Sequence, residues 1–234
     1  MKFDIITIFP NLFTNFLNES LLARAQKKKL IKINLHNLRK WTTDNHKTVD
    51  GRPYGGGAGM VLKIEPIFKA VQSLKPPNSK SKTLNPKQKT RVILLSAKGK
   101  TFDQKKAQQL TKYDQIIFIC GRYEGVDERV AKYVADEEIS IGNYVLFGGE
   151  VPTMVIIEAI SRLIPGVVAK EESVKNESFT KKTIKEHPHY TRPEVFVFKE
   201  KSFGKLRTKK LRVPPVLLSG NHKKIGEWRK KNLK

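Results

Sequence analysis

The 234-residue sequence contains a single cysteine and only five histidines, and it has no long apolar run. One cysteine excludes an internal disulfide and any cysteine-based zinc cluster. No apolar stretch is long enough to cross a bilayer. No basic-then-apolar leader is visible either, because residues 3–9 have the pattern of a strand. We therefore expect a soluble, cytoplasmic protein with no membrane partner.

Acidic residues are also scarce, with 22 Asp+Glu against 46 Lys+Arg and a formal net charge of +24. Such a balance favours a polyanionic partner, because binding to phosphates releases condensed counterions. Charge alone does not separate RNA from DNA or from an acidic membrane. A Lys-rich composition that is general to the source organism would give the same net charge. Nucleic acid is the leading expectation.

Strand and helix patterns alternate over roughly the first two thirds of the chain. A strand at residues 3–9, a helix at 11–29 and a strand at 31–35 form a β-α-β opening, which is typical of a parallel sheet. Further strands are predicted at 92–96, 115–120, 139–141 and 144–147, and further helices at 64–74, 103–113 and 150–164. The expected fold class is α/β, with room for one large domain and a small one.

Three apolar pieces between residues 115 and 153 each end in glycine, at Gly121, at Gly142 and at the Gly148–Gly149 pair. Glycine lets a ligand approach the backbone because it has no Cβ. Ligands of open α/β sheets bind at the carboxyl ends of strands. Each piece alone would be an ordinary turn. The three together, with charged residues between them, predict a binding site.

Two other loops are candidates for weaker roles. Residues 55–59 are rich in glycine and could cradle a phosphate, but they match neither the P-loop nor the dinucleotide pattern, so spacing alone favours a surface loop. Residues 75–91 carry five lysines, one arginine and no acid. They are predicted to be a mobile basic loop, either a solvated connector or an RNA contact.

The last part of the chain has a different character. Residues 167–179 show no clear periodicity and are predicted to be an interdomain linker. Residues 180–234 are rich in Lys, Arg and Pro and are predicted to form a small, mainly helical basic module. Within it, residues 199–212 contain seven basic residues and one acid.

Six separated motifs carry a family resemblance: RPYGGGAGM (52–60), CGRYEGVDERV (120–130), SIGNYVLFGGEVP (140–152), RLIPGV (162–167), HPHYTRPEV (187–195) and VPPVLLSGNH (213–222). In this order they resemble the bacterial tRNA (guanine-N1)-methyltransferase family TrmD, of the SPOUT class. The resemblance runs from Phe3 to about Lys231. One departure is the segment between PEV and VPP, which is longer here than in the better-known members.

The resemblance implies an architecture that composition and periodicity do not reveal. Residues 1–166 would form a SPOUT-type domain whose central stretch is tied into a trefoil knot, a rare feature of protein chains. Residues 180–234 would bind tRNA, at the anticodon stem-loop. The family is an antiparallel homodimer in which each active site is built from two chains.

The resemblance also implies a reaction. A methyl group passes from S-adenosyl-L-methionine to N1 of the guanosine immediately 3′ of the anticodon, tRNA position 37. The products are 1-methylguanosine and S-adenosylhomocysteine. Magnesium is associated with the family's activity, and the sequence shows no dedicated metal site. Two alternatives stay open: a SPOUT methyltransferase acting on another RNA target, and an RNA-binding protein that has lost catalysis.

The family's general base is an aspartate, and Glu177 stands in its place with a side chain one methylene longer. Glu171 or Glu172 could substitute for it. Arg162 matches the catalytic arginine, which would stabilise negative charge on guanine O6. An arginine that only interacts with the dipole at a helix C-terminus is the alternative.

The remaining site residues are also carried over from the family. Asn143 replaces an aspartate that is usual there. The predicted donor-binding residues are Leu94, Leu95, Ser96, Gly121, Tyr123, Glu124, Ile141, Gly142, Asn143, Tyr144, Val145, Leu146, Gly148, Gly149 and Pro152. The predicted tRNA contacts are His46, Asp50, Arg52, Tyr54, Gly59, His187 and Arg192, although packing is an equal alternative for the histidines at 187 and 189 and for Tyr190.

Overall fold

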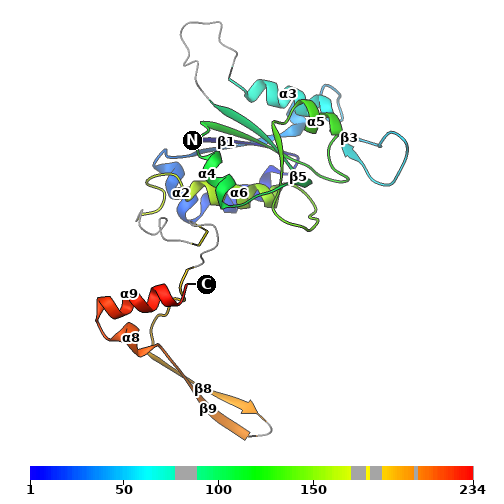
Figure 1. The fold of residues 1–234 in the computed structure, drawn as a ribbon. Helices are drawn as coiled ribbons and strands as arrows, with labels where there is room; N and C mark the ends of the chain where they lie inside the picture. Colours follow the sequence, from blue (N-terminus) through cyan, green and yellow to red (C-terminus); the bar gives the residue numbers. More distant parts are fainter. Residues whose placement is uncertain (77–88, 170–177, 180–185, 203–204, 234) are drawn as a thin grey trace, which may run out of the picture. The chain divides into compact units, whose positions relative to one another are not determined.

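The computed structural model describes residues 1–76, 89–169, 178–179, 186–202 and 205–233 (Figure 1). The chain divides into two compact units, Met1–Val174 and Lys175–Lys234, and each is described by itself. The division falls inside the predicted linker. Most of the basic loop predicted at 75–91 lies outside the described residues, as do the three candidate base residues, Glu171, Glu172 and Glu177.

The first unit is built on a five-stranded sheet with the strand order β2-β1-β6-β5-β7 (Figure 1). All neighbouring strands run parallel, which confirms the predicted α/β class. The strands are β1 (Lys2–Thr7), β2 (Lys32–Asn37), β5 (Thr90–Thr101), β6 (Gln115–Cys120) and β7 (Glu137–Ser140). A separate two-stranded sheet pairs β3 (Asp50–Gly51) with β4 (Val61–Leu62).

Helices cover both faces of the five-stranded sheet (Figure 1). On one face lie η1 (Pro10–Phe13), α1 (Thr14–Asn18), α2 (Ser20–Lys27), α4 (Gln104–Leu110) and α6 (Glu150–Ser161); on the other lie η2 (Leu38–Trp41), α3 (Ile64–Leu74) and α5 (Glu128–Tyr133). Along β6, Ile116 and Phe118 pack into the first layer, whereas Ile117 and Ile119 pack into the second. Burial on both faces explains why this strand is an unbroken apolar run.

Two sequence predictions about elements are wrong. Residues 144–147 are not a strand but a loop, in which Val145 is 86% and Phe147 95% exposed. No residue of this run pairs with a described strand, and the one bridge of this loop, between Arg122 and Gly148, lies just beyond the run. The helix predicted at 11–29 is interrupted, because Glu19 is extended and Ser20 has a φ of 53°. Asn18 and Ser20, which are poor helix formers, flank this break.

A buried carboxylate ties the N-terminal strand to its neighbours. The Asp4 side chain is fully buried, and its Oδ1 lies 2.8 Å from both Asn34 Nδ2 and His36 Nε2. Its Oδ2 accepts from Gln115 Nε2 at 2.7 Å and lies 2.9 Å from Lys2 Nζ. Burial by itself raises the pKa of Asp4, but these four partners outweigh it and lower the pKa to about 2.

We predict that this network makes folding stability depend on pH. The folded pKa lies below the ordinary value of 3.8, so the stabilisation is present above about pH 4 and is lost as the pH falls through 2. The shift corresponds to about 2 kcal/mol. Urea unfolding of the wild type and of Asp4→Asn measures it between these pH limits. The variant should show a shallower loss of unfolding free energy; parallel pH profiles would contradict the prediction.

The second unit is not mainly helical in its described residues, so that prediction is corrected. Strands β8 (Val195–Ser202) and β9 (Lys205–Arg212), of 8 residues each, form an antiparallel hairpin. Helices α8 (Pro215–Leu218) and α9 (His222–Lys231) have 4 and 10 residues. The reason lies in the Val-Phe-Val-Phe run at the start of β8, since β-branched and aromatic residues favour strands.

An aromatic cluster connects α9 to the segment before the hairpin. The ring of Trp228 lies 6.3 Å from that of His187 and 6.2 Å from that of Tyr190, between centroids. The rings of His187 and His189 are 4.6 Å apart. These contacts give the histidines and Tyr190 a packing role inside the second unit.

Candidate active site

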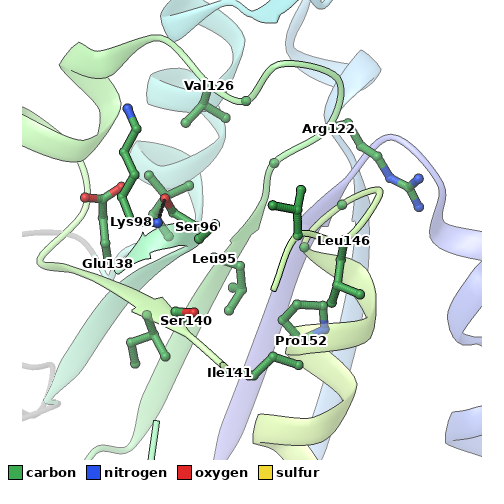
Figure 2. A pocket seen from close by; sticks show the side chains of 18 of the residues that line it. Leu95, Ser96, Lys98, Arg122, Val126, Glu138, Ser140, Ile141, Leu146 and Pro152 are labelled. Atoms are coloured by element: carbon green, nitrogen blue, oxygen red, sulfur yellow. Dashed lines mark hydrogen bonds between the residues drawn. The ribbon is translucent and has the colours of Figure 1, made fainter. Parts of the chain in front are cut away.

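A pocket opens at the carboxyl ends of β5, β6 and β7 in the first unit (Figure 2). Its wall contains every predicted donor-binding residue except Asn143: Leu94, Leu95, Ser96, Gly121, Tyr123, Glu124, Ile141, Gly142, Tyr144, Val145, Leu146, Gly148, Gly149 and Pro152. The structure thus brings together three segments that are separated in the sequence. Asn143 lies in the same loop but is not part of the wall.

One side of the pocket comes from an irregularity in β5. Both Leu95 and Lys100 pair with Ile139 of β7, so the four residues between them bulge out of the ladder. This bulge places Ser96 and Lys98 in the wall, at the same end of the pocket as Glu138 (Figure 2). A Cβ on Gly99 would come within 2.6 Å of the β7 backbone, so the bulge requires glycine there.

The loop after β6 and the loop before α6 are held against each other by backbone contacts. Gly149 N–H donates to the carbonyl of Gly121 at 2.9 Å. A Cβ on Gly149 would lie 2.8 Å from the Cα of Cys120 and 3.0 Å from the Cβ of Leu95. Gly149 is therefore required by the packing of the chain on itself, and not only by the approach of a ligand that its position at a strand end predicts.

A buried ion pair anchors these two loops to β1. Glu150 is 1% exposed, and its Oε2 accepts from Arg122 Nε at 2.8 Å while its Oε1 accepts from the Thr7 hydroxyl at 2.7 Å. The guanidinium of Arg122 also lies over the ring of Phe9, 4.8 Å from its centroid. The Arg122 side chain is thus directed toward Phe9 and Glu150, although the residue belongs to the wall of the pocket (Figure 2).

The glycine-rich loop at residues 52–60 lies beside the pocket, between β3 and β4. Glu124 N–H donates to the carbonyl of Met60 at 3.0 Å, and a Cβ on Gly59 would come within 2.6 Å of the Glu124 side chain. Tyr54 is fully exposed, and Arg52 is also exposed. Of the other predicted tRNA contacts in this region, His46 is exposed and Asp50, in β3, is half-buried.

Of the two predicted catalytic residues, the one that the structure describes, Arg162, is not in the wall of this pocket. Arg162 follows the last residue of α6 and lies ten positions after Pro152, which lines the pocket at the start of that helix. At 1.5 Å per residue the separation along the helix is about 15 Å. Glu177 lies outside the described residues. His187 and Arg192 belong to the second unit.

The structure also adds residues to the site that sequence reasoning missed. Lys98, Val126, Ala131 and Glu138 line the pocket. Glu138 lies on β7, and only the strand order, with β7 beside β5, brings it close to the bulge. In the sequence, this side of the pocket is indicated by the polar stretch Ser96–Gly99, which directly follows a buried apolar run.

Neither thiol chemistry nor a metal cluster is visible in the described part of the chain. Cys120 is fully buried, and this burial raises the pKa of its thiol far above the usual range, so it is not an activated nucleophile. Among the described residues, no group of three or more His, Cys, Asp or Glu side chains could hold a metal ion. None of the described helices is long and apolar enough to cross a membrane.

Comparison with known proteins identifies a class of RNA-modifying enzymes, the tRNA methyltransferases. The family model described as tRNA (Guanine-1)-methyltransferase TrmD matches residues 1–234, and the chain belongs to this family.

Curated relatives extend the similarity over almost the whole chain. The tRNA (guanine-N(1)-)-methyltransferase of Carboxydothermus hydrogenoformans is 50% identical over 231 residues, which cover 99% of this chain and 82% of the relative. The proteins of the same name from Anoxybacillus flavithermus and Endomicrobium trichonymphae are 48% and 46% identical. These matches cover 99% and 98% of this chain and 86% and 92% of the two relatives.

Proposed function

We propose that this protein transfers a methyl group from S-adenosyl-L-methionine to N1 of the guanosine immediately 3′ of the anticodon of tRNA. The observation that carries the proposal is the pocket beside β5, β6 and β7, whose wall includes residues of the CGRYEGVDERV and SIGNYVLFGGEVP motifs in a chain that belongs to this family. The products are tRNA containing 1-methylguanosine at position 37 and S-adenosylhomocysteine.

The residues of the pocket fit the methyl donor. Apolar side chains of Leu95, Ile139, Leu146 and Pro152 offer walls for an adenine ring. Backbone N–H and C=O groups of the glycine-bearing loops are available for hydrogen bonds to the polar edge of the adenine. Glu124 and Glu138 line the same pocket and favour a ligand that carries positive charge, whereas the Glu128 carboxylate lies 3.6 Å from the Lys98 ammonium. Bound there, S-adenosylmethionine supplies an electrophilic methyl group.

The chemistry on the RNA side requires two groups from the chain. N1 of guanine carries a proton at neutral pH, so a base must remove it before N1 becomes a good nucleophile. Negative charge then accumulates on O6 and is stabilised by a cation. Glu177 takes the role of the base and Arg162 that of the cation. Neither role needs a metal ion or a covalent enzyme intermediate.

The separation of Arg162 from the pocket supports an active site built from two chains. Within one chain the guanidinium is carried at the end of α6 that is remote from the donor pocket. A second copy can supply it. Exposed apolar side chains on neighbouring elements provide a surface for such a homodimer: Phe9, Leu12, Val151 and Val155 are 43%, 52%, 54% and 44% exposed.

The remaining parts of the proposal concern the chain's organisation. Residues 1–166 form the SPOUT domain, with the pocket segment tied into a trefoil knot, and residues 167–179 link it to a tRNA-binding domain at 180–234. The division between Val174 and Lys175 supports this organisation. The exposed Arg52 and Tyr54 beside the pocket, with His46, Asp50 and Gly59, are the proposed tRNA contacts of the first domain; His187 and Arg192 are those of the second.

The decisive experiment is a methyl-transfer assay with purified protein and labelled S-adenosylmethionine. An unmodified tRNA with two guanosines at the 3′ edge of its anticodon is compared with the same tRNA lacking the target guanosine. We expect transfer only to the first, and 1-methylguanosine in its nuclease digest. Donor binding without transfer to that tRNA would defeat the proposal and leave either another RNA target or an inactive RNA-binding protein.

A further inference from the structure

The β8–β9 hairpin fills the segment between Glu194 and Val213, which joins two of the family motifs. At about 3.3 Å per residue, each 8-residue strand extends for roughly 26 Å. None of its described residues is in the wall of the pocket. The pocket therefore does not account for the length of the hairpin or for its basic composition.

The register of the hairpin separates its side chains into two different faces. Directly opposed residues share a face, and the face alternates at each step along a strand. Val197 opposes Lys210, and Lys199 opposes Thr208, whereas Phe196 opposes Leu211. One face, here named the basic face, therefore carries Val195, Val197, Lys199, Thr208, Lys210 and Arg212 among the described side chains.

The other face carries larger apolar side chains and, among its described side chains, a compensated cation. The rings of Phe196 and Phe198 stack there at 5.8 Å between centroids. Lys209, on the same face, forms an ion pair with Glu200, the one acid of the 199–212 segment. The Glu200 carboxylate therefore lies on the face that points away from the basic face. There it offsets the charge of Lys209 and not that of a cation on the basic face.

On the basic face, positive charge is concentrated and exposed. Lys199, Lys210 and Arg212 are all exposed, and none of the described residues of this face is acidic. Lys210 and Arg212 are two residues apart on β9, a spacing of roughly 7 Å, and Lys199 is the diagonal neighbour of Lys210 on β8. Three cations in a row along a ribbon match a linear array of negative charges.

We infer that the basic face of the β8–β9 hairpin binds phosphates of the tRNA substrate, as a contact additional to those of the family motifs. This inference rests on the proposed tRNA substrate. The major groove of A-form RNA is too deep and narrow for side-chain readout, so a ribbon of lysine and arginine contacts the backbone rather than base edges. The hairpin therefore adds affinity that is independent of tRNA sequence.

The test compares three full-length proteins for binding to the unmodified tRNA by fluorescence anisotropy over a series of KCl concentrations. The first is the wild type and the second is the basic-face variant Lys199→Gln/Lys210→Gln/Arg212→Gln. The third is Lys27→Gln/Lys105→Gln/Lys112→Gln, which removes the same charge from exposed positions of the first unit. Unfolding midpoints and S-adenosylmethionine binding verify that all three are folded.

The basic-face variant is expected to bind tRNA about tenfold more weakly, and the slope of log K against log salt should fall by about 2 to 3, close to one unit for each lost phosphate contact. The control should keep most of the wild-type affinity. Equal losses of tRNA affinity in both variants, or no loss in either, would each overturn the inference.

The two proposals fail in different ways. Wild-type protein that binds tRNA through the basic face but transfers no methyl group would refute the proposed function and support the hairpin contact. Normal methyl transfer with full tRNA affinity in the basic-face variant would support the proposed function and refute the hairpin contact.

Discussion

Substituting glutamine for Glu177 is expected to slow methyl transfer about 10²- to 10⁴-fold, the usual contribution of a positioned general base. Glutamine keeps the size and the hydrogen-bonding oxygen of the side chain but does not accept the N1 proton at neutral pH. The measurement is a single-turnover rate with saturating tRNA and donor, so that a change in binding does not enter the result. The affinity for tRNA should stay near the wild-type value.

Neighbouring glutamates provide the matched controls for this prediction. Glu171→Gln and Glu172→Gln make the same chemical change a few residues earlier in the segment between the two units. We expect both to retain nearly the full rate. A wild-type rate in Glu177→Gln, with a deficit in one of the neighbours instead, would move the base to that neighbour; full rates in all three would remove the base from this segment.

The second large effect concerns stability and comes from Glu150. Its replacement by alanine is expected to lower the free energy of unfolding by about 3 kcal/mol, because Arg122 and the Thr7 hydroxyl lose their partner in the protein interior. The loops that line the pocket lose their anchor to β1 at the same time. Urea denaturation gives the free energy, and equilibrium binding of S-adenosylmethionine reports on the loops.

An exposed ion pair of nearly the same length is the control. Glu65 Oε1 lies 2.7 Å from Lys69 Nζ, against 2.8 Å between Glu150 Oε2 and Arg122 Nε. The Glu65 side chain is 67% exposed, whereas that of Glu150 is 1% exposed. Glu65→Ala should change stability only slightly, because water replaces the lost partner. Similar losses in the two variants would show that burial is not the cause of the Glu150 effect.

Local patterns were sufficient for much of the first unit. The strand at 115–120 and the helix at 64–74 are confirmed at the predicted residues, because a run of apolar side chains buried on both faces and an amphipathic repeat are properties of neighbouring residues. The second unit was predicted less well. Proline disfavours helices, and the Val-Phe-Val-Phe run favours the strand that begins at Val195, so the residues themselves argued against the predicted, mainly helical module.

The sequence by itself determined the α/β class, the strong positive charge and the glycine-bearing loops. The residues of these loops, in their order, also carry the resemblance to the family. These properties depend on residue types and short spacings. Only the tertiary structure decided that Thr7 meets Glu150 across 143 positions, that β7 lies beside β5 and brings Glu138 to the pocket, and that Arg162 is remote from it. Strand order and long-range contacts arise from how whole elements pack, and no local pattern encodes them.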